Sequence, residues 1–154
     1  MSEPLYLTPE GAEKMRIELA DLKSPQRLAI AARLRDAIQM GDLSENADYH
    51  KAKEDQSFLE GEIKELEYAL NNAIIKDGSG RKDIVSVSMH VTIQEADYEP
   101  EVFYLVGAKE ADPRAGKISH ESPIGRALMD HKVGDTVEAQ TPGGVTRLKI
   151  LHIE

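Results

Sequence analysis

Nine residues decide the fold of this chain: Gly41-Asp42-Leu43-Ser44-Glu45-Asn46-Ala47-Asp48-Tyr49. Helical patterns lie on both sides of this stretch, and the stretch contains residue types that end one helix and begin another. Glycine ends helices because, without a Cβ, it takes positive φ at little cost. Three side chains can accept hydrogen bonds from the first free N–H groups of the next helix: Asp42, Ser44 and Asn46. The stretch therefore predicts the turn of a helical hairpin with an acidic tip, residues 41–46.

The helical pattern after the tip has apolar residues at alternating steps of four and three, the spacing of a coiled-coil seam. The seam residues are Ala52, Gln56, Leu59, Ile63, Leu66, Leu70 and Ala73. Such a seam needs a partner helix, and the short connection makes the preceding helix its antiparallel partner. We therefore predict an N-terminal domain over residues 1–77 that is a long antiparallel coiled coil.

The preceding helix is predicted to begin with Thr8 as its N-cap and Pro9 in its first position. Pro25 interrupts the pattern, because proline donates no backbone hydrogen bond and crowds the preceding turn. It predicts either a kink or the start of a fresh helix. Beyond it we expect an inner stripe of Leu28, Ala31, Ala32, Arg35 and Ile38.

The composition changes at residues 78–83, which we interpret as a linker to a second domain over residues 84–154. The strands expected there from β-branched and alternating residues are 84–93, 102–106, 136–140 and 146–153. Ser122-Pro123 is typical of the start of a short helix. The predicted fold class is α+β in two domains, the second an antiparallel sheet with one short helix.

The 154 residues include no cysteine, which excludes disulfides and thiolate metal sites and is typical of a reducing compartment. No apolar run is long enough to cross a bilayer, and Met1–Pro4 lacks the features of a signal peptide. We expect a cytoplasmic protein with no membrane partner. The net charge of −9 argues against strong independent nucleic-acid binding, because such binding normally uses a basic face.

Asp42 and Glu45 are the candidate chemical groups. Their spacing favours a capping box, in which Asp42 accepts from the Glu45 amide and the Glu45 carboxylate reaches back to the backbone. The alternative is metal ligation, since Mg²⁺ binds carboxylate oxygens and waters and is often completed by a phosphate. Two carboxylates at an exposed tip are too few for a tight site. They suit an ion that is shared with another macromolecule.

Two motifs resemble those of the bacterial GreA-type transcript cleavage factors. The first is Gly-Asp-Leu-Ser-Glu-Asn-Ala-Asp-Tyr-His-Lys-Ala-Lys-Glu, residues 41–54. The second combines Ser122-Pro123-Ile124-Gly125-Arg126-Ala127-Leu128 with Thr141-Pro142-Gly143-Gly144. Both stand in the family's order, and the resemblance covers nearly the whole chain. It implies an N-terminal antiparallel coiled coil and a C-terminal FKBP-like domain.

The resemblance also implies a transcription elongation factor that docks beside the secondary channel of RNA polymerase and inserts its coiled coil. There Asp42 and Glu45 would act in trans, helping to hold a second Mg²⁺ that is shared with the polymerase and not bound tightly by the isolated chain. The polymerase, rather than this chain, would cleave the 3′ end of backtracked RNA. The implied partners are RNA polymerase and the nascent RNA 3′ end, and we expect a monomer.

Further roles follow from the match to the family. Tip support is assigned to Gly41, Leu43, Ser44, Asn46 and Tyr49, and polymerase docking to Ser122, Pro123, Ile124 and Arg126. Ile38 stands where many members carry an arginine, so Lys53 is a candidate substitute as an RNA contact. Val87-Ser88 stands where an aromatic-glycine pair is common.

Two other functions remain open from the sequence. A non-catalytic binder of the secondary channel would inhibit the polymerase, although the Asp42/Glu45 pair argues against it. A coiled-coil chaperone or scaffold would tolerate substitutions at the tip and would form an oligomer.

Overall fold

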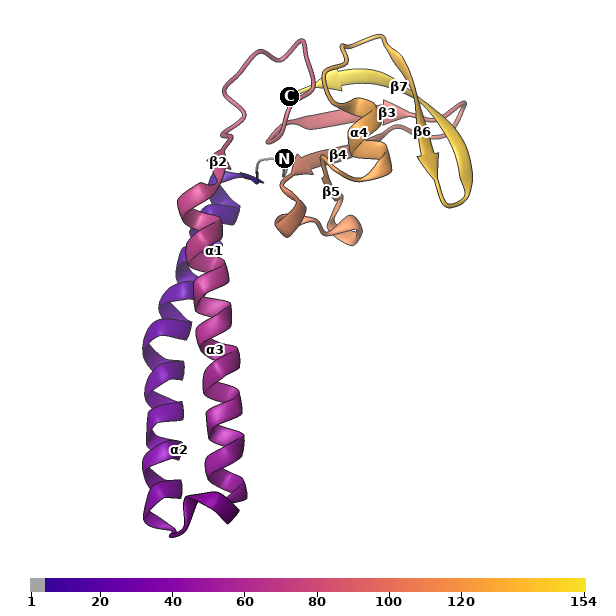
Figure 1. Cartoon of the computed structure of the whole chain (residues 1–154). Coiled ribbons are helices and arrows are strands. Elements are labelled where there is room, and N and C mark those ends of the chain that lie inside the picture. Colours follow the sequence, from indigo (N-terminus) through magenta and orange to yellow (C-terminus); the bar gives the residue numbers. More distant parts are fainter. Residues whose placement is uncertain (1–4) are drawn as a thin grey trace. The chain divides into compact units, whose positions relative to one another are not determined.

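A computed structural model describes residues 5–154, so the four residues before them, which belong to the expected coiled-coil domain, lie outside the description (Figure 1). The chain forms two compact units: residues 13–72, called here the helical hairpin, and residues 5–12 with 73–154, called the sheet unit. The expected two-part α+β organisation is confirmed. The division differs from the expected one, because residues 5–12, 73–77 and the expected linker 78–83 all belong to the sheet unit.

Backbone pairing explains this division. Strand β1 (Tyr6–Leu7) pairs in parallel with β2 (Ile74–Ile75), which directly follows the last helix of the hairpin. The amide of Ile74 donates to the carbonyl of Leu5 at 2.8 Å, and Lys76 donates to Leu7 at 2.9 Å. The segments that lead into and out of the hairpin are therefore paired with each other within the sheet unit.

The hairpin itself has the predicted two helical arms. The first comprises α1 (Pro9–Asp21), a π-helical segment (Leu22–Gln26) and α2 (Arg27–Gln39), and the second is α3 (Ala47–Asn72). Its apolar core is formed by Leu22, Leu59 and Ile63, with Leu19, Ile30 and Leu66 packed against them. The core follows the predicted seam on α3 through Leu66, and Ala69 is the next buried residue.

Pro25 lies within the π-helical segment, which joins α1 directly to α2. An α-helix would require the residue at this position to donate to the carbonyl of Asp21, which proline cannot do. A π-turn bonds each N–H one residue further back and takes up one extra residue. The break at Pro25 is therefore a local change of helix type.

The predicted inner stripe of α2 is wrong except at Ala32, which is half-buried. Leu28 and Ile38 are exposed, as are Ala31 and Arg35, whereas Ala37 is buried and Ile30 packs in the core. The buried face thus lies one residue before the expected positions. The observed stripe, Ile30, Leu34 and Ala37, recurs at steps of four and three, so it is a neighbouring helical pattern that the expected stripe displaced.

Ion pairs connect the two arms. The Arg27 guanidinium donates to both Glu60 oxygens at 2.8 Å, and Arg33 lies 2.9 Å from Asp55. The pKa of Glu60 is lowered mainly by its hydrogen bond with Arg27, and the pKa of Asp55 mainly by that with Arg33. Lys23 and Glu67 form a third pair at 3.3 Å. Basic groups on the first arm meet acidic groups on the second, which favours this antiparallel register.

The sheet unit contains a five-stranded sheet in the order β5-β4-β3-β7-β6 (Figure 1). The strands are β3 (His90–Gln94), β4 (Glu101–Val106), β5 (Lys117–Ser119), β6 (Thr136–Thr141) and β7 (Gly144–Ile153). Because β4 and β5 are parallel, the sheet is mixed and not purely antiparallel as predicted. Strand β5 was also missed, since three residues carry too little pattern.

The other predicted elements of this unit are confirmed. The β6–β7 hairpin pairs from Thr136↔Lys149 to Thr141↔Gly144. Helix α4 (Pro123–Leu128) follows Ser122, and its buried Leu128 joins a core that includes Val91, Leu105 and Ile150.

The first predicted strand of this unit is too long. It begins at His90 and not at Ile84, because Ser88 adopts φ +73° and interrupts the extended chain. This left-handed conformation is the one that glycine takes most easily. The Ser88 hydroxyl donates to the carbonyl of Lys76, and its amide donates to that of Leu105 at 2.7 Å. Residues 84–89 therefore pack as an irregular, buried segment.

Thr8 caps α1 as predicted, and it is further held by Glu110, at the end of a short 3₁₀ turn (Ala108–Glu110). The Thr8 hydroxyl accepts from the Gly11 amide at 3.0 Å and donates to Glu110 Oε1. Glu110 Oε2 accepts from the Thr8 amide at 2.8 Å and from the Gly107 amide at 3.4 Å. One half-buried carboxylate thus joins Thr8 to the 3₁₀ turn within the sheet unit.

Candidate functional site

The tip begins where α2 ends. The Met40 amide donates to the Ala37 carbonyl at 3.1 Å, and the Gly41 amide donates to the Ile38 carbonyl at 3.5 Å. Gly41 has φ +126°, the positive φ that its place in the sequence predicts. The chain leaves the helix at this residue because only glycine adopts such a conformation without strain.

Asp42 caps a single 3₁₀ turn, Leu43–Glu45. Its Oδ1 accepts from the Ser44 amide at 3.0 Å and from the Ser44 hydroxyl at 2.9 Å. These two hydrogen bonds, the amide first, lower the pKa of the Asp42 carboxyl. Within residues 5–154 no hydrogen bond or ion pair involves Oδ2. Asp42 is therefore charged at neutral pH and has one oxygen free for a ligand.

Glu45 is exposed and ends the 3₁₀ turn. The capping box expected for this pair is absent from the described structure, because Asp42 accepts from Ser44 and not from the Glu45 amide. The reason is local: the helical turn at residues 43–45 stops at Asn46, whose backbone is extended. Helix α3 starts only afterwards, so Asp42 cannot be its N-cap. The Glu45 carboxylate makes no hydrogen bond or ion pair within residues 5–154.

Asn46 is the N-cap of α3. Its Oδ1 accepts from the Tyr49 amide at 3.1 Å, while its Nδ2 donates to the Ala37 carbonyl on the other arm at 2.7 Å. His50, which the sequence did not single out, has its Nε2 3.3 Å from the Ser44 carbonyl and its ring 5.6 Å from that of Tyr49. No local sequence pattern indicates which residues of the two arms lie opposite each other, so the hydrogen bond between Asn46 and Ala37 could not be predicted.

Two further predicted residues are exposed, one in the tip and one, the candidate RNA contact, just past it. Leu43 lies between the two acids in the sequence, and its side chain is accessible together with those of Ile38 and Met40. Lys53, on α3, donates to Gln56 on the same helix at 3.3 Å. Lys53 thus remains accessible, and no acid holds it in the described residues.

The predicted docking residues lie around the start of α4. Ser122 accepts from the Gly125 amide at 3.1 Å and donates to the Ser119 carbonyl at 2.7 Å. A Cβ at Gly125 would lie 2.0 Å from the Ser119 carbonyl oxygen, so only glycine allows this close packing. Pro123 and Arg126 are exposed, and Ile124 is half-buried. The turn therefore presents these three residues on a rigid support.

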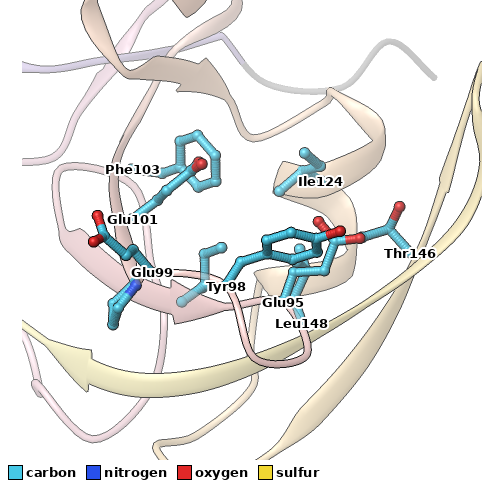
Figure 2. Close-up of a pocket in the computed structure, with 10 residues that line it drawn as sticks. Glu95, Tyr98, Glu99, Glu101, Phe103, Ile124, Thr146 and Leu148 are labelled. Carbon is cyan, nitrogen blue, oxygen red and sulfur yellow. The ribbon is translucent and has the colours of Figure 1, made fainter.

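Ile124 also lines a cavity of about 720 Å³ in the sheet unit (Figure 2). The lining combines apolar side chains, among them Phe103 and Leu148, with Tyr98 and three carboxylates, those of Glu95, Glu99 and Glu101. The sequence analysis missed this cavity, because its lining comes from separate strands, α4 and the β3–β4 connection. The acidic β3–β4 connection was the one available signal.

Family models match both parts of the chain. Residues 5–75 match the model described as "Transcription elongation factor, N-terminal", and residues 80–154 match "Transcription elongation factor, GreA/GreB, C-term". The chain belongs to the GreA/GreB family.

Curated members of the GreA/GreB family align over the whole chain. "Transcription elongation factor GreA" of Clostridium botulinum (strain Eklund 17B / Type B) is 47% identical, covering 100% of this chain and 99% of the relative. The protein of the same name from Thermoanaerobacter pseudethanolicus is 46% identical, with 99% of each covered. The crystal structure of GreA factor homolog 1 of Thermus thermophilus is 24% identical over 99% of each chain, with a TM-score of 0.45. The family assignment rests on the sequence matches.

In this GreA/GreB family member, the two tip residues that carry carboxylates, Asp42 and Glu45, are both exposed. Groups of three or more His, Cys, Asp or Glu side chains able to hold a metal ion are absent from the described residues. Each helix within residues 5–154 is too short or too polar to cross a membrane.

Proposed function

We propose that this chain is a transcript cleavage factor that works inside bacterial RNA polymerase. The observation that carries the proposal is the state of Asp42 at the tip of the hairpin. Its pKa is lowered by hydrogen bonds from Ser44 and not by a cation, and its Oδ2 is free. Asp42 and the exposed Glu45 together offer carboxylate oxygens at the tip of the helical hairpin.

These residues fit a magnesium ion. Hard carboxylate oxygens are the protein ligands that Mg²⁺ prefers, and two of them leave room for waters and for ligands from a second macromolecule. When bound, such an ion lowers the pKa of a water and stabilises the charge that develops in phosphodiester cleavage. Asp42 Oδ2 and the Glu45 carboxylate would supply this chain's share of the ligands. The polymerase would supply the rest, so the chain alone is not an enzyme.

The sheet unit would bind the polymerase surface. Its α4 turn holds Ser122, Pro123, Ile124 and Arg126 on a rigid support, and Ile124 borders the cavity of Figure 2. The apolar lining suits an apolar side chain of the polymerase, and the three glutamates suit basic residues beside it. We therefore place docking at the cavity as well as at the turn.

The negative net charge of the chain explains why it would reach RNA only by docking on the polymerase. A net charge of −9 opposes independent attraction to RNA, so the nascent 3′ end would be met only inside the polymerase. Lys53, with an accessible ammonium, is the proposed RNA contact near the tip. We propose that the chain acts as a monomer in the cytoplasm.

The test uses purified polymerase stalled on backtracked RNA, with Asp42→Asn and Glu45→Gln singly and together. The Asp42→Asn side chain can still accept from the Ser44 amide, so the tip fold is kept while the charge is removed. We expect the double variant to lose cleavage by at least a hundredfold and to compete with the wild-type chain for polymerase. Asp36→Asn, which makes the same charge change as Asp42→Asn alone at an exposed residue of α2, should cleave like the wild type.

Full cleavage by the double variant would overturn the mechanism. Inhibition without cleavage by the wild-type chain would instead identify a non-catalytic channel binder. Failure of the wild-type chain to bind polymerase would favour a chaperone or scaffold.

A further inference from the structure

One side chain at the tip bonds to both arms of the hairpin. Asn46 Oδ1 accepts from the Tyr49 amide in the first turn of α3, and Asn46 Nδ2 donates at 2.7 Å to the Ala37 carbonyl in the last turn of α2. We propose that Asn46 is the positioning residue that holds Asp42 and Glu45 in place for cleavage. This inference rests on the proposed function and adds a residue that touches neither metal nor RNA.

The bond to Ala37 gives a carbonyl at the end of α2 a second donor. The last carbonyls of a helix lack partners within it, because no later turn supplies N–H groups. The Ala37 carbonyl receives two donors, the Met40 amide at 3.1 Å and Asn46 Nδ2. Ala37 itself is 2% exposed, and Asn46 is half-buried. Water therefore competes less with this bond than with a surface one.

The same bond closes the loop that bears the two acids. Asp42 and Glu45 both lie in the segment between Ala37 and Asn46, which are nine residues apart. Inside this segment the hydrogen bonds of Asp42 with Ser44 are local and do not reach either arm. His50 connects this segment to α3 only, with its Nε2 3.3 Å from the Ser44 carbonyl. Without Asn46, no side-chain hydrogen bond among the described residues would join the end of α2 to the start of α3.

Asparagine is required because it combines a donor and an acceptor on a short side chain. Aspartate is as good an N-cap but offers no donor, and serine caps well but is too short to reach the other arm. Asn46→Asp and Asn46→Ser should therefore keep the start of α3 and remove the link to Ala37. The serine variant does so without adding charge. Small displacements of catalytic groups lower rates by large factors, about a hundredfold for 1 Å.

The experiment uses the full chain and a matched control on the same helix. Asn72 donates Nδ2 to the Tyr68 carbonyl at 2.8 Å, one turn back on α3. Asn72→Asp makes the same chemical change but breaks no link between the arms. Cleavage by stalled polymerase is measured against factor concentration. For both Asn46 variants we expect the maximal rate to fall at least tenfold, with the half-saturating concentration within twofold of the wild type.

Amide hydrogen exchange on the isolated chain gives a second readout that needs no polymerase. We expect exchange at the Met40 and Ser44 amides to be at least fivefold faster in both Asn46 variants and unchanged in Asn72→Asp. A wild-type maximal rate in either Asn46 variant would overturn the inference, as would unchanged exchange or an equal loss in the control. A wild-type chain that stimulates no cleavage would overturn the proposed function, and the inference with it.

Discussion

Replacing Thr8 with valine should destabilise the sheet unit by about 3 kcal/mol. The Thr8 hydroxyl makes two hydrogen bonds that valine, with nearly the same shape, cannot make. The bond from the Gly11 amide is an N-cap, worth about 1 kcal/mol. The bond to the charged Glu110 carboxylate is worth about 1.5–3 kcal/mol. Thr8 is 1% exposed, so water cannot replace either bond.

Thr8→Ser is the matched control, because it keeps the hydroxyl and removes only a methyl group; it should cost about 1 kcal/mol. A double-mutant cycle of Thr8→Val with Glu110→Gln should give a coupling of about 1 kcal/mol or more, since the two side chains are bonded directly. Glutamine leaves an acceptor for the Thr8 amide, so this variant is expected to fold.

The assay is urea unfolding followed by the NMR amide signals of β3 and β4, which report on the sheet unit alone. The hairpin is a separate unit, so a whole-chain signal would mix two transitions. The reasoning would be refuted by a Thr8→Val variant as stable as Thr8→Ser, or by purely additive effects in the cycle.

Two further predictions concern one unit each. In urea unfolding, the free energy of unfolding of Ser88→Ala should be about 1 kcal/mol lower than that of Ser88→Gly. Both variants lose the hydroxyl hydrogen bond, but alanine is strained at a φ of +73° and glycine is not. The opposite order of stability would contradict this. The melting temperature of the helical hairpin should fall as the pH drops below about 4. The pKa values of Glu60 and Asp55 are lowered in the folded state, so the stability that their ion pairs contribute is lost when these carboxylates are protonated. Arg27→Gln with Arg33→Gln should flatten this dependence, and an equally steep fall would refute it.

The elements that the sequence predicted well are those with strong local signals. The α3 seam repeats its pattern over several turns, and Thr8, Gly41 and Ser122 act within a few residues of their own position. Each of these features is decided by the short stretch of chain that contains it. They therefore follow from residue types alone.

The elements that it missed depend on distant partners. The buried face of α2 lies one residue before the expected stripe, because packing against α3 decides which of two neighbouring apolar stripes faces inward. Ser88 in the left-handed region ended a strand that its neighbours favour, because its bonds to Lys76 and Leu105 outweigh local propensity. Asn46 was predicted as a cap, but its bond to Ala37 depends on tertiary structure.

The pKa values of Asp55 and Asp42, both in the hairpin, are lowered by different kinds of donor. At Asp55 the principal cause is the Arg33 guanidinium, which cancels the negative charge as it stabilises it. At Asp42 the causes are the Ser44 amide and hydroxyl, which stabilise the charge and leave it uncancelled. A cation partner at Asp42 would keep the carboxylate ionised equally well, but it would compete with Mg²⁺ for the same oxygens. The neutral donors at Asp42 therefore suit the proposed sharing of Mg²⁺ better than a cationic partner would.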